Sequence, residues 1–140
     1  MSTIFALSSL LVMPFWFLMI FLPRWRWTKR LLASVWVSAL AAVLYTALVL
    51  PQIAQVLPAV LNPNLAEIAS LLSTERGATI AWVHFLAFDL FVGRWVYLDS
   101  QNRQLSSWLI SPTLFFVLML GPFGFVLYLF IRQFRSAPAR

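Results

Sequence analysis

The sequence predicts an all-α membrane protein with four transmembrane helices and a short interfacial amphipathic helix between the second and third. Apolar residues make up 62% of the 140 residues and charged residues only 10%, whereas a soluble domain has about 45–50% apolar and about 25% charged residues. The mean hydropathy is +0.88. Four long apolar runs follow one another along the chain. We therefore expect a single four-helix domain over residues 1–135 and a polar tail over residues 136–140.

The positions of the basic residues explain the formal net charge of +6. Four of them fall within residues 23–30, between two apolar runs, and Arg132 and Arg135 follow the last run. Basic residues at the ends of apolar runs anchor helices at the lipid headgroups and set their orientation. We therefore expect membrane lipid, and not nucleic acid, as the partner of these side chains. The absence of cysteine excludes disulfides, iron–sulfur clusters and thiolate chemistry.

The first apolar run covers residues 4–22 and contains Pro14, so we expect a span with a kink. No Lys or Arg precedes it and no small-residue cleavage site follows it, which favours a retained helix over a signal peptide. Trp25 and Trp27 alternate with arginines directly after it, a pattern typical of the headgroup region.

The second run, residues 31–50, ends before Pro51, and its small residues would allow a neighbouring helix to approach closely. A connector over residues 52–77 follows. Within it, the apolar positions 65, 68, 69 and 72 have helical spacing, and Asn64 with Glu67 resembles a capping box. This short helix could cover a site entered from the membrane, or be a packed connector.

The third run, residues 78–98, holds the most informative side chains. About 21 residues at ~1.5 Å each span roughly 30 Å, which is enough to cross a bilayer. The run contains His84, the chain's one histidine, together with Asp89 and Arg94. Asp89 falls near the expected midplane, where an ionised carboxylate costs about 2.5–3.5 kcal/mol on insertion scales. A side chain kept there at such a cost is a candidate functional residue.

A short polar turn is expected over residues 99–107, followed by a fourth apolar run over residues 108–131. Pro112 and the segment Gly121-Pro122-Phe123-Gly124 interrupt this run, so we expect a helix that is kinked or thinned in its second half. The glycines leave backbone open to another helix or to a flat ligand. Four spans would place both termini on one side, opposite the first and third loops.

A helical wheel separates the three polar groups of the third run. With His84 at 0°, Asp89 lies near about 140° and Arg94 near about 280°, so each is expected to face a different neighbour. Asp89 and Arg94 could still satisfy each other or nearby hydroxyl groups, and His84 could bond a backbone carbonyl. Acid–base chemistry and ligation of a porphyrin metal remain open for His84. One histidine excludes a bis-His haem or a multi-histidine iron centre within one chain.

These residues resemble the neoxanthin-synthase-like family, whose plant member is named for abscisic-acid deficiency. The resemblance rests on Trp82-Val83-His84, Asp89-Leu90-Phe91, Arg94, Tyr97, Asp99 and Gly121-Pro122-Phe123-Gly124. It extends over nearly the whole chain. Without the chloroplast transit region of the plant members, the sequence is similar to a cyanobacterial-type member.

The resemblance implies a carotenoid substrate or ligand in the thylakoid or cytoplasmic membrane of a photosynthetic organism. The associated plant reaction turns the epoxide of violaxanthin into the allene of neoxanthin, a redox-neutral isomerisation that requires no cofactor. Asp89, protonated because it is desolvated, would be the acid, His84 the base, and Arg94 would polarise or anchor the end ring. The expected ligand contacts are Trp82, Phe85, Phe88, Phe91, Tyr97, Gly121, Phe123 and Gly124.

A second hypothesis makes the chain a non-enzymatic accessory subunit of a photosystem or another photosynthetic complex. It would bind carotenoid or chlorophyll, with His84 as a magnesium ligand and Asp89 paired with Arg94 for structural reasons. A third makes it an assembly factor without a ligand.

Overall fold

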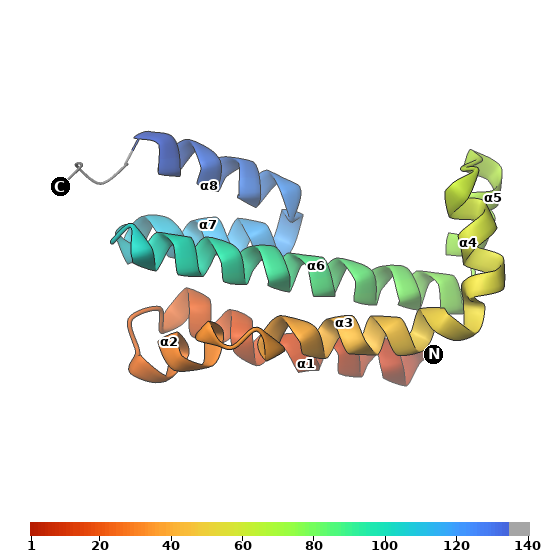
Figure 1. The fold of residues 1–140 in the computed structure, drawn as a ribbon, viewed down its shortest axis with the longest axis horizontal. Helices are drawn as coiled ribbons and strands as arrows, with labels where there is room; N and C mark the ends of the chain where they lie inside the picture. Colours follow the sequence, from red (N-terminus) through yellow and green to blue (C-terminus); the bar gives the residue numbers. More distant parts are fainter. Residues whose placement is uncertain (135–140) are drawn as a thin grey trace.

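The computed structural model describes residues 1–134, and within that range the protein is entirely helical (Figure 1). The helices are α1 (Ser2–Phe21), α2 (Arg26–Ala33), α3 (Trp36–Val49), the 3-10 turn η1 (Leu50–Gln52), α4 (Ile53–Leu61), α5 (Leu65–Leu72), α6 (Glu75–Asn102), α7 (Ser107–Leu120) and α8 (Pro122–Phe134).

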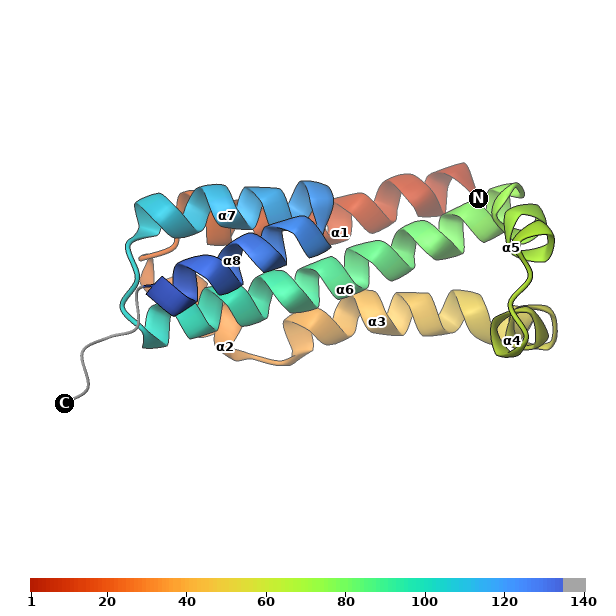
Figure 2. The ribbon, with the colours of Figure 1, turned by 90° about the horizontal axis from the view of Figure 1, so that it is seen from above.

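Helix α6 is the longest helix and forms the axis of the molecule (Figures 1 and 2). Helix α1 runs beside most of its length, and α3 runs beside its N-terminal part. Helices α7 and α8 lie against its C-terminal half only, whereas α4 and α5 lie across its other end. The N-terminal half of α6 therefore has fewer helical neighbours than the C-terminal half.

Three helical stretches are long and apolar enough to cross a membrane, judged by length and composition: α1, Trp36–Leu61 and α6. The stretch Trp36–Leu61 changes direction at η1, which contains Pro51, so that α4 leaves the line of α3 (Figure 1). Helix α4 occupies part of the segment expected to be a connector. Its neighbour α5 has the predicted bounds, and the Asn64 side chain caps it by accepting from the Ala66 N–H at 2.9 Å.

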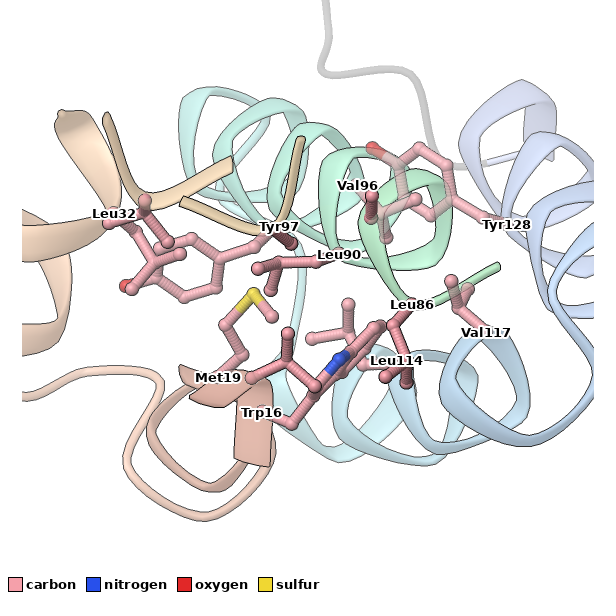
Figure 3. Close-up of a cluster of buried hydrophobic side chains, with 14 of the residues drawn as sticks. Trp16, Met19, Leu32, Leu86, Leu90, Val96, Tyr97, Leu114, Val117 and Tyr128 are labelled. Carbon is pink, nitrogen blue, oxygen red and sulfur yellow. The ribbon is translucent and has the colours of Figure 1, made fainter. Parts of the chain in front are cut away.

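The core lies where α6 meets α1 and α7. Trp16 and Met19 of α1 point towards α6, where Trp16 lies beside Leu86 (Figure 3). Gly93 makes this contact possible, because a Cβ atom there would lie 2.3 Å from the Trp16 ring. The close approach of α1 to α6 thus depends on one glycine facing one indole.

The fourth apolar run is not a single helix, and the prediction of a fourth span is wrong in that form. It folds into α7 and α8, which run antiparallel as a helical hairpin (Figure 1). The chain turns at Gly121, whose φ of +40° is unfavourable for residues with a side chain. Pro122 then begins α8, where its missing N–H does no harm. The 14 residues of α7 span about 21 Å, which is less than the ~30 Å of a bilayer core.

Gly124 brings the two helices of the hairpin together, since a Cβ atom there would lie 2.1 Å from the Val117 nitrogen. Asp99 then ties α8 to α6. Its Oδ2 accepts hydrogen bonds from the Tyr128 hydroxyl at 2.5 Å and from Arg103 Nε at 2.8 Å, and Arg132 Nε lies 3.3 Å away.

Two further expectations are corrected by this arrangement. Residues 99–102 belong to α6, so the polar turn begins later than predicted. Helix α8 ends near the C-terminal end of α6, whereas α1 begins at the opposite end (Figure 1), so Phe134 and Met1 do not lie on one side. Arg135 and the predicted tail over residues 136–140 lie outside the described residues.

The second apolar run also differs from its prediction. Its first residues belong to the short amphipathic helix α2, which ends at Ala33, and α3 begins only at Trp36. Ser34 adopts an extended conformation between the two helices, with φ −72° and ψ 127°. This break has consequences for the site described next.

Candidate functional site

Helix α6 presents His84, Asp89 and Arg94 to three different neighbours, as the helical wheel predicts. His84 faces α3, Asp89 faces the turn between α7 and α8, and Arg94 faces the end of α2. The structure therefore does not bring these three side chains together around one point.

Asp89 lies at the tip of the α7–α8 hairpin. Its Oδ1 would be only 2.6 Å from a Cβ atom placed on Gly121, so the carboxyl group rests against the backbone of the turn. The side chain is half-buried, and among residues 1–134 it has no hydrogen-bond or ion-pair partner. The expected pairing of Asp89 with Arg94 or with a nearby hydroxyl group is therefore wrong.

Arg94 is used to close the end of α2. Its Nε donates to the Leu32 carbonyl at 2.7 Å, and its Nη2 donates to the Ala33 carbonyl at 3.0 Å. The last carbonyls of a helix lack partners within the helix, and a guanidinium also favours the negative end of the helix dipole. Arg94 thus holds α2 in place and helps to define the break before α3. Its predicted contact with an end ring stays a prediction.

His84 lies in an aromatic surrounding on the α3 side. Its ring centre is 5.0 Å from that of Tyr45, edge to face, and 4.8 Å from that of Phe88. The expected hydrogen bond to a backbone carbonyl is not formed, and no other hydrogen-bond partner of His84 occurs in the described part of the chain. Within those residues no cluster of three or more His, Asp or Glu side chains could hold a metal ion.

The predicted aromatic contacts lie mostly on the outer surface of α6. Phe85 and Phe88 are each 58% exposed and Phe91 is 52% exposed. Trp82 stacks on Phe5 of α1, and its indole N–H donates to the Ser9 hydroxyl at 3.0 Å. These side chains are accessible to a ligand that approaches the outer surface of α6.

Two of the predicted ligand residues have a structural use. Tyr97 is fully buried, and its hydroxyl donates to the Pro23 carbonyl at 2.8 Å, which joins α6 to the first loop. Gly124 lies inside the α7–α8 contact. Phe123, in contrast, is 55% exposed at the hairpin turn beside Gly121. The ligand roles of Tyr97, Gly121, Phe123 and Gly124 stay predictions. The exposure of Phe123 is compatible with a ligand contact.

Sequence reasoning missed a groove between α3 and α6. It has a volume of about 360 Å³ and an almost wholly apolar surface. Val35, Ser38, Ala39 and Ala42 line it from α3 and the residue before it, and Ala87, Phe88 and Phe91 line it from α6. The small residues of the second run indicated a close helix contact, but they leave an open groove here. A larger apolar groove of about 570 Å³ lies between the end of α1 and the start of α7, away from Asp89.

Comparison with known proteins agrees with the resemblance seen in the sequence. The sequence model of the family described as ABA DEFICIENT 4-like matches residues 3–128. The protein named ABA DEFICIENT 4, chloroplastic, from Arabidopsis thaliana is 31% identical over 112 residues. This alignment covers 76% of the chain but only 51% of that relative, so the chain spans about half of its length. No solved structure matches the chain.

Proposed function

Because the chain belongs to the ABA DEFICIENT 4-like family, we propose that it acts on a carotenoid in a photosynthetic membrane. The chloroplast location in the name of its relative supports a thylakoid membrane. The three long apolar stretches support integral insertion, and one of them, Trp36–Leu61, reaches its length only because α3 continues through η1 into α4. In this arrangement the α7–α8 hairpin enters the membrane without crossing it, and α5 lies at the interface. A cyanobacterial source stays a prediction.

The proposed reaction is the isomerisation of an epoxy-carotenoid to an allene. One carbon–oxygen bond of the epoxide breaks and its oxygen takes up a proton, which makes a hydroxyl group. Loss of a proton from the adjoining polyene carbon then forms the second double bond of the allene. One proton enters and one leaves, so the step needs no oxidant, reductant or cofactor. It requires an acid and a base close to the same end ring.

Asp89 is the observation on which this proposal rests. It is a carboxyl group halfway along an apolar helix with no partner among residues 1–134, so no structural contact there accounts for it. It lies at the turn of the hairpin, and the hairpin does not extend over the N-terminal half of α6 (Figure 2). A hydrophobic end ring can reach it from the lipid, beside the exposed Phe85 and Phe123.

We assign both proton transfers to Asp89. His84 was predicted as the base, but it faces α3 while Asp89 faces the hairpin turn. A single end ring held at Asp89 would not reach His84 around the helix. The protonated carboxyl group can donate to the epoxide oxygen, and the resulting carboxylate can then remove the proton from the adjoining carbon. This returns Asp89 to its starting form.

The test is conversion of violaxanthin by the purified protein in detergent or vesicles, followed by chromatography of the products. Asp89→Asn keeps the size of the side chain and should reduce conversion by at least about 100-fold, since general acid–base catalysis contributes 10²- to 10⁴-fold. Glu67→Gln removes a carboxyl group from α5 and should convert normally. Full conversion by Asp89→Asn, or none by the wild type, would contradict the proposal.

An accessory subunit that binds chlorophyll is the second candidate, favoured by the absence of a hydrogen-bond partner for His84 within residues 1–134. A free imidazole can ligate magnesium. His84→Ala would then lose one chlorophyll per chain on purification from photosynthetic membranes and would detach from any photosystem bound through it. Under the isomerase proposal, His84→Ala keeps its violaxanthin conversion and its pigment content.

A further inference from the structure

We propose that helix α2 binds the headgroup of an anionic phospholipid, at the end of the molecule that faces the cytoplasm or the stroma. The inference rests on the membrane insertion proposed above and does not depend on the proposed reaction. Two observations carry it: two guanidinium groups converge on one indole ring, and the fold collects basic side chains at this end.

Arg26 and Arg30 converge on the ring of Trp27. Their Cζ atoms lie 5.6 and 5.8 Å from the centre of that ring, and the three side chains line a hollow of about 370 Å³. Like charges four residues apart destabilise a helix, and within residues 1–134 no carboxylate lies at ion-pair distance from either arginine. A phosphate group in the hollow would accept hydrogen bonds from both guanidinium groups and offset this repulsion.

The opposite face of α2 is fixed to the protein, which keeps the two arginines at the surface. Thr28 and Leu32 are fully buried, and the Thr28 hydroxyl donates to the Leu22 carbonyl at 2.8 Å. Arg94 binds the last carbonyls of α2, as described above. Helix α2 is therefore amphipathic, with Trp27 and both arginines exposed. Such helices lie in the plane of the membrane interface, where indole rings occupy the level of the headgroups.

The tertiary structure places further positive charge around α2. The same end of the molecule contains the α6–α7 loop and the end of α8 (Figures 1 and 2). Besides Arg94, the described residues at this end include six basic side chains: Arg24, Arg26, Lys29, Arg30, Arg103 and Arg132. Asp99 is the acidic side chain there, whereas the opposite end carries Glu67, Glu75 and Arg76. The hairpin increases this asymmetry, because a fourth span would have moved the end of α8 to the other side.

This distribution of charge indicates both the partner and the leaflet. Lys and Arg are enriched on the cytoplasmic side of membrane proteins, to which the stroma corresponds in a chloroplast. Anionic lipids attract basic residues that lie close to the membrane surface. A zwitterionic headgroup would bring its own cation towards the arginines. A soluble phosphate would lack the acyl chains that hold a headgroup at the level of Trp27.

The experiment measures phospholipid bound to the purified full-length protein by native mass spectrometry. The protein in mild detergent is titrated with phosphatidylglycerol, which is anionic, or with phosphatidylcholine, which is zwitterionic and is given the same acyl chains. The wild type should bind phosphatidylglycerol at least about tenfold more tightly, since each basic residue near an anionic surface contributes about fivefold. Equal affinity for the two lipids would overturn the inference.

Variants of α2 locate the site. Arg30→Gln should lower the affinity for phosphatidylglycerol about fivefold and the pair Arg26→Gln/Arg30→Gln about 25-fold, with phosphatidylcholine binding unchanged. Arg76→Gln removes one exposed charge at the opposite end and should bind like the wild type. An equal loss in Arg76→Gln would overturn the assignment to α2. The pair Arg26→Lys/Arg30→Lys keeps both charges and should bind more tightly than the glutamine pair, and equally weak binding would contradict a charge-based site.

Two further measurements separate the alternatives. Glycerol phosphate, a soluble phosphate without acyl chains, should not displace phosphatidylglycerol at tenfold excess, and displacement would overturn the lipid in favour of soluble phosphate. Washing vesicles with sodium carbonate tests insertion by itself. Extraction of the wild type would contradict the proposed insertion and this inference together, whereas retained protein with equal lipid affinities would contradict this inference alone.

The leaflet is tested with one cysteine, since the chain has none of its own. Gln104→Cys lies in the α6–α7 loop at the α2 end. After expression in a bacterial inner membrane, it should react with an impermeant thiol reagent in inverted vesicles and not in intact spheroplasts. Reaction in intact spheroplasts would overturn the orientation.

Discussion

Asp89 shows at the residue scale how a candidate functional group can be recognised by its lack of a structural purpose. Asp99, ten residues later in the same helix, accepts from Tyr128 and Arg103 and so joins α8 to α6. Asp89 has no such contact within residues 1–134, and its carboxyl group lies against the turn at Gly121. Two carboxyl groups of one helix therefore differ in what they contribute to folding.

This difference predicts that the neutral variant Asp89→Asn is more stable than the wild type. Removing a half-buried carboxyl group that has no partner should raise the free energy of unfolding by about 1 kcal/mol, as is common where a functional residue is costly for stability. Thermal unfolding in detergent should show a Tm a few degrees higher. Asp99→Asn serves as the contrast and should lower the Tm. A lower Tm for Asp89→Asn would mean that the carboxyl group has a structural role.

Arg94 is expected to behave in the opposite way from Asp89. Its two hydrogen bonds to the end of α2 involve a charged donor, and each such bond contributes about 1.5–3 kcal/mol. Arg94→Leu should therefore lower the Tm and increase hydrogen exchange in the last turn of α2. Arg76→Leu, at an exposed position of α6, provides the control. If hydrogen exchange in α2 were unchanged in Arg94→Leu, the hydrogen bonds from Arg94 to the Leu32 and Ala33 carbonyls would not be needed to stabilise the end of α2.

The α7–α8 hairpin is the element that sets the position of the candidate site. Its turn lies beside Asp89 because α7 ends at Leu120, well before it could cross a bilayer. Two glycines serve different purposes in it. Gly121 provides a left-handed backbone conformation, and Gly124 allows the helices to touch.

At this scale we predict that Gly121→Ala destabilises the hairpin. A residue with a side chain at a φ of +40° costs about 1–3 kcal/mol, and the added Cβ would press on the Asp89 carboxyl group. Thermal unfolding should show the loss, together with reduced violaxanthin conversion. Leu120→Ala, at the exposed neighbouring position, should change stability by less than about 0.5 kcal/mol. Equal stability of the two variants would show that the turn is not strained.

For the whole molecule, the hairpin predicts three crossings where the sequence predicted four, because only three helical stretches are long and apolar enough to cross a membrane. The end of α8 then lies on the same side as the loop between α6 and α7, and the start of α1 lies on the other side (Figure 1). If α7 and α8 formed one continuous span, the end of α8 would lie on the opposite side of the membrane from the loop between α6 and α7. The two arrangements can be separated by labelling.

The absence of cysteine makes this topology directly testable. Single cysteines are introduced at the exposed positions Ser2, Ser70, Gln104 and Gln133, and oriented vesicles are treated with a membrane-impermeant thiol reagent. Gln104 and Gln133 should react from one side, and Ser2 and Ser70 from the other. If Gln133 reacted from the side of Ser2, the hairpin would have to be replaced by a full span.

The sequence by itself determined the helical class, the bounds of α5 and the separation of His84, Asp89 and Arg94 around α6. Each depends on spacing along one chain segment, which the 3.6-residue period translates directly into geometry. Composition alone identified the apolar runs, because burial in lipid requires a continuous apolar surface. The family resemblance could likewise be recognised without a structure, because it depends on the order of residues along the chain.

Only the tertiary structure decided which neighbour each polar group meets. The contact of Asp89 with the Gly121 turn and the use of Arg94 at the end of α2 both arise where segments distant in sequence come together. Hydropathy could not distinguish one kinked helix from a hairpin over residues 108–131, because both place the same side chains in an apolar environment. That choice depended on the contacts of Gly124 with α7 and of Tyr128 with Asp99, which no local pattern encodes.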